Sequence, residues 1–169
     1  MNIKEKLGNN EILSIYLREH NNRKGPDFYL LKRFLRKKKE KYILSLDSQE
    51  IDNIIMPHHF FCDCNHRFNL KGIIWRRFGG LKLREVYSKI DSKYSMNNPT
   101  CWGKIQTQLF LVHKKKSNII LCLGRPAYFS SNYFALKNKK DKLYLIDGFH
   151  RLIALKLNKN KKLRFILLR

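Results

Sequence analysis

Residues 143–157 place the tightest constraint on how this chain can fold. The apolar run at residues 143–146 has the length of a strand, and the Asp147-Gly148 pair that follows it is typical of a turn. Beyond the turn, apolar residues recur at spacings of three and four along residues 149–157, which predicts a helix with one buried face. The sequence therefore favours a fold in which strands and helices share one core.

The start of this predicted helix has the composition of a phosphate-binding site. The first N–H groups, at Gly148, Phe149 and His150, point out of the helix end, where the helix dipole adds positive charge. Gly148 has no side chain to obstruct a phosphate, and Arg151 offers a planar pair of donors. Asp147 could hold a metal ion. A simpler interpretation also fits, in which Asp147 caps the helix while His150 and Arg151 face solvent.

The run 146–152 (Ile-Asp-Gly-Phe-His-Arg-Leu), followed by Ala154 and Leu155, resembles the signature of the ParB/sulfiredoxin superfamily. The resemblance covers residues 124–169 and implies a core made of a small mixed sheet with flanking helices. Phe149 stands where sulfiredoxins carry their reactive Cys, so reduction of a sulfinic acid is not expected. The order Gly-Phe-His-Arg also differs from the Gly-Glu-Arg-Arg of chromosome-partitioning members. The Asp-Gly-x-His-Arg version of the motif, which this chain carries, is similar to that of the branch that includes free-serine kinases, ATPases and nucleases.

This resemblance implies that Gly148, His150 and Arg151 hold a nucleoside triphosphate such as ATP. Asp147 would then bind Mg²⁺ or assist the acceptor, and Asp147 and His150 are the expected catalytic residues. Arg125 lies in a loop that is close to the nucleotide in the related fold, so it is a second expected phosphate ligand. A kinase also needs a carboxylate base, and the sequence does not select among four candidates: Glu50, Asp52, Glu85 and Asp91.

The whole chain is expected to form an α+β fold with an N-terminal basic helical appendage. Residues 1–41 would form the appendage, and residues 42–169 the ParB/sulfiredoxin-like nucleotide-binding domain. Further strands are expected at residues 42–46, 72–78, 105–112, 119–123, 133–136 and 163–167. Further helices are expected at residues 47–55 and 81–94.

The chain carries 36 Lys and Arg against 13 Asp and Glu, which gives a formal net charge of +23. This excess favours an anionic partner, and nucleic acid is the expected one, although the codon bias of an AT-rich genome could also enrich lysine. Residues 28–41 combine an apolar stripe with many cations, which suits a phosphate backbone, an anionic membrane or plain solvent. The expected nucleic-acid contacts are Arg33, Arg36, Lys37, Arg76, Arg77 and Lys115.

No segment has the apolar length of a signal peptide or of a membrane span, so a cytoplasmic protein without a membrane partner is expected. Its cysteines are then expected to be reduced. Cys62, Cys64 and His66 are side chains of the kind that bind metals. However, Cys-x-Cys is not the spacing that wraps one tetrahedral ion, so a structural role is favoured and a metal site is the alternative.

The expected function is an enzyme, an ATPase or phosphotransferase that binds a nucleoside triphosphate and acts on nucleic acid or is anchored to it. One alternative is an ATP-dependent kinase of a free hydroxy amino acid or similar metabolite. Another is a nuclease, in which Asp147, His150 and Arg151 attend a scissile phosphate. A non-catalytic module that binds DNA or a protein partner is also consistent with the sequence.

Overall fold

The computed structural model describes residues 2–56, 82–88, 99–111, 118–124, 126, 140–157 and 164–169. Within these ranges the chain forms one five-stranded sheet with the strand order β1-β2-β5-β3-β4. The strands are β1 (Asn2–Lys6), β2 (Lys41–Ser45), β3 (Asn118–Leu123), β4 (Leu143–Asp147) and β5 (Arg164–Leu168). The sheet is mixed, because β3 and β5 run parallel while the other neighbours run antiparallel.

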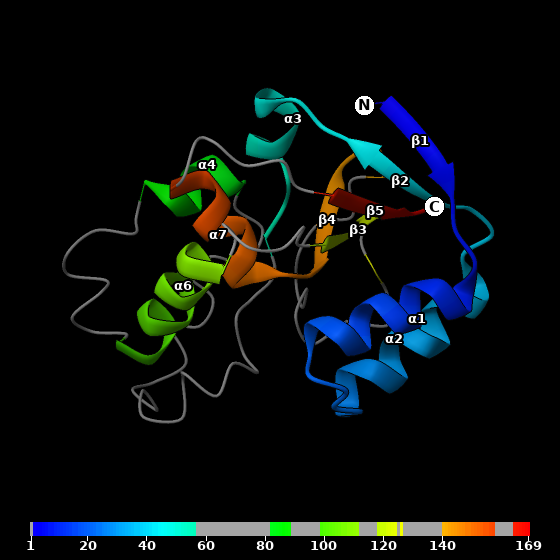
Figure 1. Cartoon of the computed structure of the whole chain (residues 1–169). Coiled ribbons are helices and arrows are strands. Elements are labelled where there is room, and N and C mark those ends of the chain that lie inside the picture. The colour runs from blue at the N-terminus through cyan, green and yellow to red at the C-terminus, as the bar shows by residue number, and fades with distance from the viewer. Residues whose placement is uncertain are drawn as a thin grey trace, which may run out of the picture.

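Helices cover both faces of the sheet (Figure 1). One face packs against α1 (Asn9–Glu19) and α2 (Pro26–Lys37). The other face packs against α3 (Ser48–Asp52), α4 (Leu83–Tyr87), α6 (Pro99–Leu111) and α7 (Phe149–Leu157). The described part of the chain is thus a small α+β fold of a mixed sheet and flanking helices, as the sequence predicts.

Alternation along the strands produces these two cores. Phe165 and Leu167 of β5 face the core under α7, whereas Ile166 and Leu168 face the core under α1 and α2. All four are almost fully buried, so the central strand has apolar residues on both faces. The sequence of a strand buried on both faces is a continuous apolar run, which is why residues 163–167 could be predicted as a strand.

The N-terminal segment is part of this fold. Strand β1 pairs with β2 in the antiparallel sense, and the boundary expected after residue 41 falls inside β2. Helix α2 lays Phe28, Leu31 and Phe34 into the same core as the strands. The segment expected as an appendage is basic and helical, but it supplies strand β1 and the two helices that pack on one face of the sheet.

Residues 105–112 were expected to be a strand, and this prediction is wrong, because residues 105–111 lie in helix α6. Trp102, Ile105 and Leu109 pack against the core, and their spacings of three and four are those of a helix face. Phe110 lies outside this stripe and is 70% exposed. The expected strands at residues 72–78 and 133–136 lie outside the described residues. In the part of the chain that the structure describes, no helix is long and apolar enough to cross a bilayer.

Candidate functional site

The junction between β4 and α7 depends on Gly148. Its φ of +102° is a conformation that side chains disfavour. A Cβ placed on Gly148 would also lie 2.6 Å from Cδ1 of Ile119. The chain therefore turns here only with glycine, and α7 begins directly afterwards, with the N–H of Leu152 donating to the Gly148 carbonyl at 2.8 Å.

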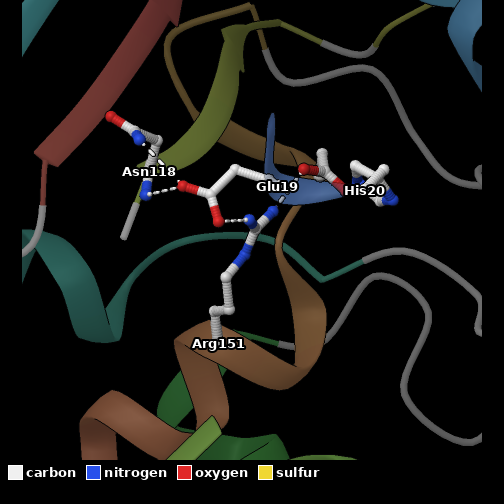
Figure 2. A network of polar contacts seen from close by, with 5 residues as sticks. Glu19, His20, Asn118 and Arg151 are labelled. Carbon is white, nitrogen blue, oxygen red and sulfur yellow. Dashed lines mark hydrogen bonds and ion pairs between the residues drawn. The ribbon is translucent and has the colours of Figure 1, made fainter. Parts of the chain in front are cut away.

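Arg151, in the first turn of α7, carries its charge in a buried position. The residue is 6% exposed because α7 packs closely on the sheet. Its Nη2 donates to Oδ2 of Asp147, the last residue of β4, and its Nη1 lies 2.6 Å from Oε2 of Glu19. Figure 2 shows the guanidinium in contact with Glu19, the last residue of α1. One cation is thus paired with two carboxylates from different elements.

Glu19 is held in place by β3. Its second oxygen, Oε1, accepts hydrogen bonds from the backbone N–H of Asn118 at 3.2 Å and from the Asn118 side-chain amide at 2.9 Å (Figure 2). Asn118 is the first residue of β3. The polar contacts therefore tie together the ends of α1, β3, β4 and α7 at one point.

His20 supplies the fourth side chain of this ion network, which we define as Glu19, His20, Asp147 and Arg151. The Nε2 of His20 lies 3.1 Å from Oδ1 of Asp147. The imidazole stacks on the ring of Tyr16, with centroids 4.1 Å apart and planes inclined by 19°. Burial raises the pKa of the Tyr16 phenol, so that side chain is neutral at physiological pH.

The electrostatics of the network keep its central pair ionised. Burial alone would raise the pKa of Asp147, but the charge of Arg151 and the hydrogen bond with His20 lower it to about 2. Burial acts to lower the pKa of Arg151, and the charges of Asp147 and Glu19 outweigh it and raise that pKa. A carboxylate and a guanidinium therefore face each other at the start of α7 throughout the physiological pH range.

The predicted site residues 147–151 lie together at the start of α7, but their side chains differ in burial and in the partners that they contact. Phe149 is buried in the core, so its contribution to a site is confined to its backbone. The His150 ring packs edge-on against the Phe149 ring at a centroid distance of 5.5 Å and is partly exposed. Arg151 is buried and ion-paired, which excludes the simpler interpretation that it faces solvent.

Three of the candidate carboxylate bases have structural partners away from the network. Glu50 and Glu85 accept hydrogen bonds from the N-cap residues of α3 and α4. Asp52 lies 2.6 Å from the Lys156 ammonium. Glu19, which is not one of the four candidate bases, is instead the second carboxylate beside Arg151.

Several predicted residues lie outside the described part of the chain. These are Arg125, Arg76, Arg77, Lys115, Asp91, Cys62, Cys64 and His66. Among the residues that the structure does describe, no group of three or more His, Cys, Asp or Glu side chains is arranged to hold a metal ion. Asp147 could contribute to a Mg²⁺ site together with ligands from another molecule, such as phosphate oxygens.

The predicted nucleic-acid contacts on α2 share its outer surface. Arg33, Arg36 and Lys37 are exposed, while Leu31 and Leu35 pack on the sheet. Lys32 is exposed on the same helix, and Lys39 is exposed beyond its end. We call the exposed cations Lys32, Arg33, Arg36 and Lys37 the α2 cationic face. The apolar stripe of helix α2 is thus buried in the core, and the charges of the helix lie at the surface.

Comparison with known protein families, with curated proteins and with solved structures found no match.

Proposed function

We propose that this protein is a nucleotide-binding enzyme that takes a nucleoside triphosphate with Mg²⁺ at the β4–α7 junction and binds nucleic acid on the α2 cationic face. One observation carries the nucleotide part of the proposal. The Arg151 guanidinium lies at the very start of α7, since a Cβ on Gly148 would be 3.3 Å from its Nε and 3.4 Å from its Nη2.

Two sources of positive charge therefore coincide at this point. The start of a helix attracts anions through its N–H groups and its dipole, and a buried guanidinium binds phosphate oxygens through two parallel donors. In the structure, the carboxylates of Asp147 and Glu19 compensate this charge. A phosphate group is the ligand whose charge and geometry would take the place of Glu19 on Arg151.

The ionised Asp147 carboxylate favours a magnesium ion beside the phosphate. Asp147 is ionised, and a phosphate brought close to it would be repelled unless a cation came too. Mg²⁺ commonly binds to one or two carboxylates together with substrate phosphates. The magnesium complex of a nucleotide supplies the anion that suits Arg151 and the cation that suits Asp147. Phosphoryl transfer draws mainly on such positioning and charge neutralisation.

The nucleic-acid part of the proposal is supported by the position of α1 and α2. The exposed cations of α2 form a surface on which a phosphate backbone finds several partners. The preceding helix, α1, ends at Glu19, which contacts Arg151, and its C-cap residue His20 contacts Asp147. Nucleic acid bound on α2 would therefore lie on the helical layer that also reaches the nucleotide site.

Two substitutions with opposite expected effects test the nucleotide site. Arg151→Lys keeps the charge but loses the planar fork, so we expect affinity for ATP with Mg²⁺ to fall about tenfold or more. Glu19→Gln removes the anion that competes with phosphate but keeps an oxygen for Asn118, so affinity should rise, by about tenfold. Arg169→Lys is the control, because Arg169 pairs with Glu40 at 3.6 Å away from the network.

Equilibrium titration with ATP and Mg²⁺ measures these affinities, with thermal melting to check that each variant is folded. The proposal is contradicted if folded Arg151→Lys and Glu19→Gln bind ATP as the natural sequence does. Turnover is then followed with γ-labelled ATP, with and without nucleic acid. Label released as phosphate faster with nucleic acid supports a coupled ATPase, and label transferred to a hydroxy amino acid would point to the metabolite kinase instead.

A further inference from the structure

The outer surface of α2 carries an exposed aromatic ring among its cations. Tyr29 is 60% exposed. Lys32, Arg33 and Arg36 follow it at spacings of three, four and seven, which places them on the same side of the helix. All three are exposed. Tyr29 therefore lies on the same side of α2 as these cations, at the N-terminal end of the α2 cationic face.

Among the described residues, the core beneath α2 does not include the Tyr29 ring. The preceding residue, Phe28, is 7% exposed and fills the core with Leu31, Phe34 and Leu35. Phe28 meets the Tyr29 ring edge-on, with centroids 5.5 Å apart and planes inclined by 84°. A buried neighbour thus supports one part of the ring, and the rest is presented to solvent in a defined direction.

We propose that the α2 cationic face binds single-stranded nucleic acid, with an unpaired base stacked on Tyr29 and the adjoining phosphates on Lys32, Arg33 and Arg36. The inference rests on the proposed function for its nucleic-acid partner and adds which form of that partner binds. Cations alone suit a duplex as well as a single strand, because both present a chain of phosphates. An aromatic ring among the cations suits a single strand, whose bases have uncovered faces that stack on aromatic side chains.

The test compares a labelled single-stranded oligonucleotide with the same sequence as a duplex, by fluorescence anisotropy at several salt concentrations. Tyr29→Ala should weaken single-strand binding by about tenfold to a hundredfold, the range known for loss of one stacked base. Its salt dependence should not change, because no charge is lost. Tyr29→Phe should bind as the natural protein does. Alanine is a strong helix former and Tyr29 is exposed, so α2 should keep its fold.

Phe110→Ala is the matched control, because Phe110 is an exposed aromatic residue on a helix of the opposite layer. It should leave both affinities unchanged. The inference is overturned if Tyr29→Ala changes neither affinity, or weakens duplex and single strand equally. In both cases the natural protein still binds nucleic acid, so the proposed function stands. If the natural protein binds neither oligonucleotide, the nucleic-acid part of the proposed function fails together with the inference.

Discussion

The Nε2 of His20 lies 3.1 Å from Oδ1 of Asp147, although 127 positions separate the two residues in the sequence. This contact joins the end of α1 to the end of β4, and the pairing of Glu19 with Arg151 at 2.6 Å joins α1 to the start of α7. The β4–α7 junction is therefore bound twice to the α1 region, which packs on the other face of the sheet. A ligand that replaces one of these partners would act on the packing of α1 as well as on its own site.

The first prediction concerns the pH dependence of stability. The pKa of Asp147 lies at about 2 in the folded protein, below its ordinary value of 3.8. The folded state therefore favours the ionised form, which stabilises the protein above about pH 4 by about 2 kcal/mol, and this contribution is lost as the pH falls toward 2. Asp147→Asn should reduce the free energy of unfolding by about this amount at pH 7.

Urea unfolding of both proteins between pH 2 and pH 7 measures the effect. The difference in the free energy of unfolding should shrink as the pH approaches 2, because the natural protein loses the ionised carboxylate that the variant never had. A difference that stays constant over this range would contradict the role of the ionised Asp147.

The second prediction concerns the turn at Gly148. Gly148→Ala combines an unfavourable positive φ with a Cβ that would lie 2.6 Å from Ile119, so it should reduce the free energy of unfolding by at least about 2 kcal/mol. Gly103, in α6, is the matched control, since a Cβ there meets no atom within 4 Å. Gly103→Ala should stabilise the protein, by about 0.5–1 kcal/mol. Urea unfolding of both variants gives the two signs, and equal effects would refute the account of the turn.

Some elements of the fold can be predicted from the sequence and others cannot. The β4–α7 unit is predictable because its strand, turn and helix signals are local and consecutive. Helix α6 is not predictable in the same way, because its apolar and β-branched residues also fit a strand. Only the structure shows that Trp102, Ile105 and Leu109 pack against the same core. Strand β1 has every residue exposed and carries Lys and Glu, so it lacks the apolar alternation that marks a strand.

The candidate site was predictable only in its local part. Residues 147–151 are consecutive, and the properties of a helix start follow from the sequence. The partners of Arg151 and Asp147 were not predictable, because Glu19 and His20 reach them through the packing of α1 on the sheet. The sequence indicates that Gly148 leaves space for a phosphate, and the structure adds that packing against Ile119 requires glycine here.

The third prediction concerns the charges of α2. Each cation that contacts a phosphate of a single strand contributes about 0.7 to the slope of log affinity against log salt concentration. Replacing both Lys32 and Arg36 by Gln should therefore reduce that slope by about 1.4. Arg84→Gln is the control, because Arg84 is an exposed cation on α4 in the opposite layer. A loss of about 0.7 in the control, as large as that expected for one α2 cation, together with an unchanged slope for the α2 variant, would show that the binding surface is not α2.

The fourth prediction concerns magnesium. In the proposed site the phosphate oxygens of the nucleotide supply part of the magnesium ligands, so Mg²⁺ alone should bind weakly. Mg²⁺ and ATP should each increase the affinity of the other, by the same factor. Titrations of ATP with and without Mg²⁺, and of Mg²⁺ with and without ATP, measure the two factors. Tight binding of Mg²⁺ in the absence of nucleotide would argue for a separate metal site.

The most direct measurement uses the only Asp-Gly pair in the chain, Asp147-Gly148. Protein labelled at aspartate carbonyls and glycine amides gives a single NMR signal from the Gly148 amide in a carbonyl-filtered spectrum. Titration with ATP and Mg²⁺ should shift this signal in a saturable way at concentrations up to about 1 mM, while the Gly103 amide stays in place in the unfiltered spectrum. A Gly148 signal that does not move over that range would contradict nucleotide binding at the start of α7.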